Sequence, residues 1–388
     1  MTALADRSVD GRRRAALEAF SAAPLPARAL HLWRYTDPAR LLPGDLPVAK
    51  SGLEDTVPIR PGVRVASLAP ALDEAEVRER FASLSNEGTG KFEALNLAHF
   101  GAGGLVTIAP GARPEAPIEV IHGAAAGSDF DAGSFACPRV LVLVGEGAEA
   151  SIVEEYGTNG WEPSLVHAVT EVFLAPGARL VHSVVNSFGP KVRANLVHRA
   201  RLDRAASLTL VSVGLGGDVV KLDASAVLAG EHARSEVLGL SFGTGRQHMD
   251  SHFFQDHQAP RTTSDLLVKT ALSDRARASY TGQLRIAGEA PGSEAHQENR
   301  NLLLSEAARA DSIPELEILT HEVQCSHAAA TGPVDAAMLF YLRSRGLDER
   351  RALNAIVEGF LEPVLARVPG EALQASLRQA AARRLGEG

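Results

Sequence analysis

A cysteine and two histidines lie close together near residue 325. In the segment HEVQCSHAAATG, His321 lies four residues before Cys325 and His327 lies two after it. Residues two apart in an extended strand project from the same face, so Cys325 and His327 would be neighbours. A thiolate beside an imidazole is a soft donor pair, suited to iron or to sulfur transfer. Two ligands do not complete a metal site, so a cluster here would need ligands from another chain. The spacing alone slightly favours a purely structural role.

A second polar group lies in the segment RQHMDSHFFQDH. On a strand, His248, Asp250 and His252 would share one face. These three side chains are a candidate metal-binding cluster. The favoured interpretation is a polar ladder, a row of polar side chains on a solvent-exposed face. Cys137, in FACPRVLV, precedes an apolar strand and is expected to be a small buried hydrophobe.

Several common catalytic motifs are absent from the sequence. No G-x-x-x-x-G-K-[ST] phosphate loop is present, so the chain is not expected to hydrolyse ATP by itself. The sequence also lacks a G-x-S-x-G elbow, which removes support for a serine hydrolase.

Composition excludes further classes of protein. The 388 residues include 39 Lys and Arg against 47 Asp and Glu, a net charge of −8, which argues against a chain that coats nucleic acid. Two cysteines are too few for a disulfide framework or for a self-sufficient four-cysteine zinc or iron–sulfur site. With no apolar run near the length of about 20 residues that spans a bilayer, and no secretory signal, we expect a soluble cytoplasmic protein with no membrane partner.

The pattern of residues predicts three regions. Residues 1–98 form an N-terminal helical domain, with helices over Arg12–Phe20 and Asp73–Leu84 and a loop over Pro43–Gly62. Residues 99–332 contain short alternating apolar runs typical of strands. Residues 333–388 form a C-terminal helical domain, with helices over Val334–Arg345, from Asp348 to Val368, and over Glu371–Leu385.

A loose repeat runs through the strand region. A small residue precedes an alternating strand at intervals of 30, 28 and 27 residues, and the five instances are Ala148, Ala178, Ala206, Ala233 and Ala276. A strand-only repeat of this length favours a β-solenoid, in which each coil packs on its neighbours. A β-sandwich remains the alternative from the pattern alone.

An ordered set of motifs between residues 248 and 360 resembles the SufB/SufD family of iron–sulfur cluster scaffolds. The family's H-x-x-P-x-T-x-S-D-x-x-x-K and Q-x-N-x-N-L-L-L-S patterns are similar to residues 257–269 and 297–305. Its P-x-L-E-I and V-x-C-S-H patterns are similar to residues 314–318 and 323–327. Further similar segments are Y-x-G at Tyr280–Gly282, LFYLRSRG at Leu339–Gly346, WRYTD at Trp33–Asp37, FEALN from Phe92, PIEV from Pro117 and PRVLVLVGEGAEA from Pro138.

Within the family, the chain resembles the SufD branch. The SufB branch is expected to carry its cluster-building cysteine in the strand that precedes an L-L-I motif, where this chain has Asn299. The C-S-H element with Cys325 and His327 is of the SufD kind. The usual D-D before V-x-C is His321-Glu322 here, and the usual H-G-A-T is HAAAT, which changes the expected turn.

The resemblance implies a fold that is mainly β with helical ends: a right-handed parallel β-helix flanked by N-terminal and C-terminal helical domains. It also implies a non-catalytic scaffold that pairs with a SufB paralogue through β-helix strands and binds a SufC ATPase through its C-terminal helices. His327, with Cys325 beside it, would contribute to a transient iron–sulfur cluster at the SufB interface, with no cofactor held permanently by this chain. The residues expected to dock the ATPase are Phe340, Tyr341, Arg343 and Arg345.

Two alternatives stay open at this point. The alternatives to a SufD-type scaffold are a SufB-like homodimeric scaffold and, in a different class, a β-helix enzyme acting on polysaccharide. The second is disfavoured by two Trp, four Tyr and the lack of a signal peptide. Asp265 and Lys269 are expected to have structural roles.

Overall fold

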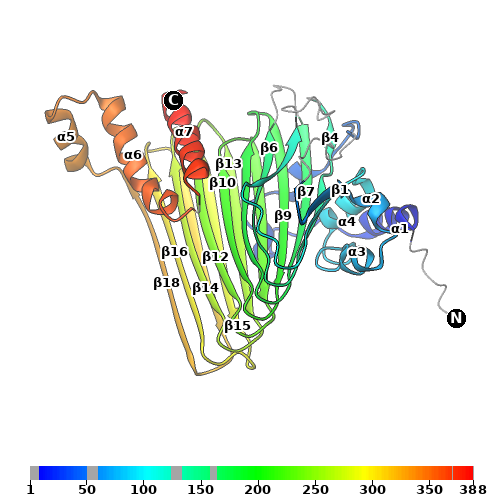
Figure 1. The fold of residues 1–388 in the computed structure, drawn as a ribbon. Coiled ribbons are helices and arrows are strands. Elements are labelled where there is room, and N and C mark those ends of the chain that lie inside the picture. The colour runs from blue at the N-terminus through cyan, green and yellow to red at the C-terminus, as the bar shows by residue number, and fades with distance from the viewer. Residues whose placement is uncertain (1–7, 50–59, 124–132, 158–163, 369, 388) are drawn as a thin grey trace.

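Two largely parallel sheets form the body of the protein (Figure 1). The computed structural model describes residues 8–49, 60–123, 133–157, 164–368 and 370–387. The first sheet has the order β1 (Val63–Ser67), β2 (Gly104–Ile108), β5 (Arg139–Val144), β7 (Ser164–Leu174), β9 (Val192–Leu202), β11 (Val219–Leu228), β13 (His248–His257), β15 (Arg277–Ile286) and β17 (Arg309–Ile318), with β4 (Phe135–Ala136) beside β7. The second has the order β18 (Val323–Pro333), β16 (Ser293–Leu303), β14 (Thr263–Leu272), β12 (Arg234–Gly243), β10 (Ser207–Gly214), β8 (Arg179–Ser187), β6 (Glu149–Gly157) and β3 (Ile118–Gly123).

Successive strands alternate between the two sheets, which makes the body a parallel β-solenoid. From β5 to β18, each long strand pairs in parallel with the strand two positions along the chain, as β11 does with β13. Only β1 and β2 pair in antiparallel fashion among the described strands. The predicted solenoid is confirmed and the sandwich alternative is wrong, because a sandwich is built from antiparallel sheets.

The turns of the solenoid explain the repeat. One edge has a column of residues with positive φ, which are Gly147, Gly177, Ala205, His232, Arg261 and Gly292. A small residue with no exposed surface follows each of them, in the order Ala148, Ala178, Ala206, Ala233, Thr262 and Ser293. The assignment of Ala276 to this column is wrong, because it lies in the turn between β14 and β15 at the other edge. There Arg275 separates it from the positive-φ residue Asp274.

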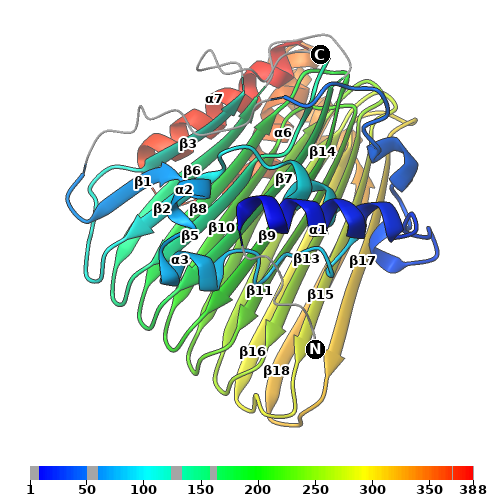
Figure 2. The same cartoon turned by 90° about the vertical axis from the view of Figure 1, so that its right-hand side faces the viewer.

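The N-terminal helices cover the outer face of the first sheet, with α1 crossing its strands (Figure 2). They are α1 (Val9–Ala22), α2 (Leu68–Ala71), α3 (Ala75–Arg80) and α4 (Lys91–His99), with the 3-10 helices η1 (His31–Trp33) and η2 (Pro38–Leu41). Buried Asn96 of α4 donates from Nδ2 to the carbonyls of Pro138 and His167 at 2.8 and 2.7 Å, which fixes this helix on the solenoid. The predicted helix over residues 12–20 is confirmed within α1. The region predicted to be helical, residues 1–98, also contributes the strand β1 to the first sheet. The predicted loop over 43–62 lies partly outside the described residues, at 50–59.

The helix predicted over residues 73–84 is shorter than expected. It ends at Arg80 because the chain turns there with Ala82 at φ 55°. The carboxylate of Glu171, on β7, then accepts hydrogen bonds from the backbone N–H groups of Ala82, Leu84 and Ser85 at 2.9, 2.9 and 3.1 Å. Glu171 therefore accepts hydrogen bonds from backbone N–H groups that would have bonded within a longer helix.

The C-terminal helices are α5 (Ala336–Ser344), α6 (Glu349–Leu365) and α7 (Glu371–Glu387). Asp335 and Asp348 cap α5 and α6 by accepting backbone N–H groups, and Gly346 ends the first of these helices at φ 96°. The apolar stripe of α6 packs on the outer face of the second sheet, opposite the side that the N-terminal helices cover (Figure 1). Within the described residues, no helix combines the length and apolar character needed to cross a membrane.

A polar cluster lies inside the coils around the carboxylate of Glu154, which is 1% exposed. Tyr156 and Thr170 donate to it at 2.6 and 2.9 Å, and His122 and His182 lie 3.2 and 3.1 Å from it. Burial alone would raise the pKa of Glu154, but hydrogen bonds from the two imidazoles hold that pKa well below its ordinary value. His198 lies beside the cluster, with its Nε2 3.1 Å from Nδ1 of His182.

We expect acid to destabilise the fold through its buried imidazoles. Burial lowers the pKa of His198 to about 3, with His182 and Arg199 acting in the same direction and Glu154 opposing them. Burial also lowers the pKa of His167 and of His257 to about 4. The unfolded chain therefore binds protons below about pH 6.5 that the folded chain does not. Between about pH 7.5 and pH 5 the free energy of unfolding should fall by about 2 kcal/mol for each such imidazole.

Urea unfolding as a function of pH tests this expectation. His198→Asn should reduce the fall in the free energy of unfolding with acid by the contribution of one imidazole, because it removes one imidazole that is neutral in the folded chain. His232→Asn is the control, since His232 lies at an exposed turn with φ 63°, a conformation that Asn tolerates. If the two variants show the same pH dependence as the parent chain, His198 does not titrate as described.

Candidate functional site at the open end of the solenoid

The solenoid ends with β17 and β18, which form an open end. Each is the last strand of its sheet, and no other strand in the described part of the chain pairs with its outer edge. Burial changes abruptly there: β14 is almost wholly buried, whereas no residue of β18 is. An exposed strand of 11 residues with unpaired backbone groups is a ready template for pairing with another chain.

Cys325 and His327 lie on β18 at this open end. Their register partners on β16 are Ala295 and Gln297, whose side chains are buried inside the preceding coil. The two residues therefore project on the interior side of the solenoid, where the next coil would lie. Cys325 is half-buried and, like Leu316 and Val323, packs against the core, and His327 is exposed. The strand places both residues on one face, as the spacing predicts.

The side chain of Cys325 is a protonated thiol, as expected where a metal site lacks its other ligands. Burial raises the pKa of its thiol, partly offset by a backbone hydrogen bond from Ala295, so in the free chain it is a thiol at neutral pH. The described residues contain no group of three or more His, Cys, Asp or Glu side chains arranged to hold a metal ion. Further ligands for a metal at Cys325 would therefore have to come from outside the described residues.

The backbone N–H and C=O groups of Cys325 and His327 also face the open edge of β18. The N–H of Val334 donates to the carbonyl of Leu303 at 3.3 Å. Alternate residues of a parallel strand face alternate neighbours, so the even-numbered residues of β18 pair with β16. The N–H and C=O groups of Cys325, His327 and Ala329 consequently face the open edge, where a strand from a partner would align beside these side chains.

The surrounding side chains hold the last two coils in place. Buried Gln297 accepts a hydrogen bond from Tyr280 at 2.9 Å, and His296 lies 2.6 Å from the hydroxyl of Ser326. Asn299 donates to the carbonyl of Val268 at 3.2 Å and accepts from Asn301 at 2.9 Å. The position at which the SufB branch is expected to carry a cysteine is thus filled by a buried, hydrogen-bonded amide inside the coil.

The polar group at residues 248–252 does not lie on the solvent-exposed face that the sequence favours. These residues face outward on β13, but the N-terminal segment covers them, and Asp250 has no exposed surface. Thr36 donates to Asp250 at 2.6 Å, His252 lies 3.1 Å from it, and the ammonium group of Lys221 lies 3.5 Å from it. The expected solvent-exposed ladder is wrong, because residues near 36 pack over the sheet and bury it.

Two residues of the family motifs anchor the C-terminal helices. Lys269 donates to the carbonyl of Phe360 on α6 at 2.9 Å, and Asp265 accepts from Arg367 at 2.5 Å. These contacts agree with the structural roles expected for both. Cys137 has no exposed surface, and burial raises the pKa of its thiol well above the ordinary value, as expected for a small core residue.

Of the predicted docking residues, Phe340, Tyr341 and Arg343 lie on α5, which has no buried residue, and Arg345 is the C-cap residue that follows it. Phe340 and Tyr341 are 74% and 54% exposed, and the guanidinium of Arg345 lies 5.2 Å from the centre of the Tyr341 ring. Arg343 forms a 3.5 Å ion pair with Glu349. Only two residues separate α5 from the end of β18, so a partner on this helix would be coupled to the open edge.

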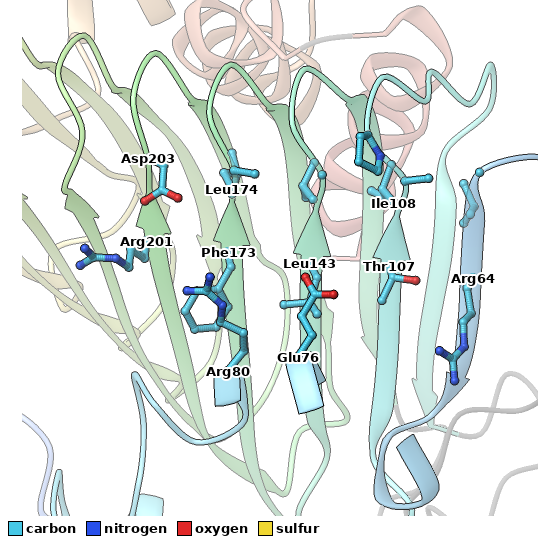
Figure 3. Close-up of a pocket in the computed structure, with 17 residues that line it drawn as sticks. Arg64, Glu76, Arg80, Thr107, Ile108, Leu143, Phe173, Leu174, Arg201 and Asp203 are labelled. Carbon is cyan, nitrogen blue, oxygen red and sulfur yellow. The ribbon is translucent and has the colours of Figure 1, made fainter. Parts of the chain in front are cut away.

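A separate pocket lies at the other end of the solenoid. It is lined by residues of β1, β2, β5, β7 and β9 and by Glu76 and Arg80 of α3 (Figure 3). Arg80 lies over the ring of Phe173, 5.2 Å from its centre. None of its lining residues belongs to β17 or β18, so this pocket is distinct from the open end.

Comparison with known proteins identifies the family. The family described as "SUF system FeS cluster assembly, SufBD core domain" matches residues 126–360, which span most of the solenoid, α5 and most of α6. The chain belongs to the SufBD family of SUF-system iron–sulfur cluster assembly proteins. A SufBD family protein of Mycobacterium tuberculosis is 31% identical over 87% of this chain and 83% of its own length.

Two further relatives show the range of similarity within the SufBD family. A SufBD family protein of Mycobacterium leprae is 30% identical over 89% of this chain and 86% of its own length. The protein SufB of Bacillus subtilis is 28% identical over 76% of this chain and 62% of its own length. The family resemblance inferred from the motifs is therefore confirmed.

Proposed function

We propose that this SufBD family protein is a SufD-type scaffold that pairs with a SufB-type paralogue to build iron–sulfur clusters. The observation that supports this most is the open end of the solenoid, where unpaired backbone groups and the Cys325–His327 pair lie on the same strand. A SufB-type solenoid would align a strand beside β18 and supply the ligands that this chain lacks. The cluster would be a transient product at that interface, and this chain would act without catalysing a reaction itself.

The SufD assignment rests on two positions. Asn299 is a bonded core amide where the SufB branch is expected to have its cysteine, and Cys325 with His327 forms the C-S-H element. The similarity to the Bacillus subtilis SufB favours one second candidate, a SufB-like scaffold that pairs with a copy of itself. The same open edge would serve in that case, so the identity of the partner decides between the two.

We further propose that a SufC-type ATPase docks on α5. Phe340 and Tyr341 form an exposed aromatic surface next to Arg343 and Arg345. Because α5 follows β18 so closely, movement of the ATPase on this helix would pull on the open edge where the cluster forms. Such coupling would let ATP turnover by a partner expose the assembly site, in the cytoplasm.

A pull-down with SufB-type and SufC-type partners from one operon tests the proposal. The expected result is a complex of all three chains, with Phe340→Ser/Tyr341→Ser losing the ATPase subunit and keeping the SufB-type partner. Leu17→Ser is the matched control, because Leu17 is an exposed apolar residue on α1. If the chain forms only a homodimer, the SufB-like candidate replaces the SufD assignment.

A further inference from the structure

An arginine-rich pocket lies on the first sheet where β13, β15 and β17 begin. Residues of the N-terminal segment, including Tyr35, Thr36 and Asp37, form one side of it, and the strands and their turns form the other. In Figure 2 this blue N-terminal segment lies beside β17. The arginines that line the pocket are Arg28, Arg40, Arg246, Arg275, Arg277 and Arg309.

The coil repeat stacks four of these cations. Arg277 pairs in register with His248 on one side and with Arg309 on the other, and neighbouring strands are separated by about 4.8 Å. Arg246 and Arg275 occupy equivalent positions in successive turns, each directly after a residue with positive φ. The pocket therefore presents two columns of arginines. Within each column, successive arginines are one coil apart.

Carboxylates do not neutralise this charge. Of the six arginines, only Arg40 forms an ion pair with a described residue, with Asp218 at 2.8 Å. Arg309 donates to the carbonyls of Glu306 and Ala308, and Arg28 to the carbonyl of Arg34. Arg246, Arg275 and Arg277 form no ion pair within the described part of the chain. The lining carboxylates are Asp37, which caps η2, and Asp311.

This accumulation of positive charge favours the binding of an anion. Like charges at neighbouring positions of a sheet repel each other, here on a chain whose net charge is −8. Concave surfaces lined by one sign of charge concentrate the field and attract ions of the opposite sign. The wall of the pocket is fixed in place, since buried Thr36 is hydrogen-bonded to Asp250 and lies 3.1 Å from Nε2 of His248.

We propose that this pocket binds a small molecule that carries a diphosphate or triphosphate group. Guanidinium groups form bidentate hydrogen bonds with phosphate oxygens, and several arginines spaced along two columns match a chain of linked phosphates. The N-terminal segment closes one side of the pocket, which favours a compact ligand over an extended polymer. The proposal stands on the pocket alone and does not depend on the function proposed above.

Titration calorimetry on the full chain tests the site, with inorganic pyrophosphate, tripolyphosphate and ATP as probes. Binding should weaken steeply as salt rises, because phosphate contacts release counterions. Arg246→Gln/Arg275→Gln/Arg277→Gln should weaken binding by about tenfold or more, the loss expected for several charge-assisted contacts.

The control carries the same change in charge elsewhere. Arg179→Gln/Arg204→Gln/Arg234→Gln alters exposed arginines that lie outside the pocket and form no ion pair with described residues. It should bind the probes as the parent chain does, and thermal unfolding should show both variants folded. No measurable heat with the parent chain at millimolar probe, or an equal loss in both triple variants, would overturn the proposal.

Discussion

Glu171→Ala should lower the free energy of unfolding by about 3–5 kcal/mol, the usual cost of removing one partner of a buried ion pair. Glu171 and Arg139 lie 2.8 Å apart with side chains 1% and 0% exposed. The alanine would leave the guanidinium of Arg139 buried without its counter-charge. It would also remove the acceptor for three backbone N–H groups in the segment after α3. The loss is a large fraction of the 5–15 kcal/mol that stabilises a typical domain.

Glu155→Ala is the matched control for this prediction. Glu155 lies exposed on β6 and forms no ion pair with a described residue, so its replacement should change the free energy of unfolding by less than about 0.5 kcal/mol. Denaturant unfolding measures both, and hydrogen exchange should show that Glu171→Ala weakens protection first in α3 and the segment up to Ser85. Equal stability of the two variants would mean that the buried pair does not hold the N-terminal helices in place.

Ala329→Pro should weaken assembly with the proposed SufB-type partner by about 10- to 100-fold while the chain stays folded. The N–H of Ala329 faces the open edge of β18, so proline removes a donor that a partner strand would use and places a ring in its path. The pairing of β18 with β16 uses the alternate residues and stays intact. The loss corresponds to roughly 1–3 kcal/mol from one missing backbone hydrogen bond and local steric conflict.

The control at the same position keeps the donor. Ala329→Ser retains the N–H and should bind the partner as the parent chain does. Affinity is measured by titrating each variant into the immobilised SufB-type partner, and circular dichroism checks the solenoid. Full affinity in Ala329→Pro would show that the partner binds elsewhere than at the edge of β18.

The solenoid was predictable from the sequence because each coil imposes the same local requirement. A buried small residue is needed where the chain enters the second sheet, which explains Ala148, Ala178, Ala206 and Ala233. Ala276 was misplaced because the turns at the opposite edge also end in a small residue, one position later. Similarly, the cap at Asp348 and the helix end at Gly346 follow from local backbone chemistry.

Features that depend on distant partners could not be predicted. Thr36 and Asp250 are 214 positions apart, and Ala82 and Glu171 are 89 apart, so neither contact leaves a local pattern. For the same reason the sequence predicts an exposed cluster at residues 248–252 and a longer α3 than the structure has. The sequence shows the pair Cys325 and His327, but only the fold shows that their strand is the open edge.

Anaerobic reconstitution of the purified complex with iron and sulfide tests the central claim most directly, that Cys325 and His327 form one half of a shared cluster site. His327→Ala should keep the complex intact and lower the cluster yield, read from visible absorbance and from iron and sulfide content. The loss should be at least about tenfold, the effect typical of residues that support a metal site. His321→Ala, an exposed histidine outside the strand, should leave the yield unchanged. An unaltered yield in His327→Ala would contradict the claim.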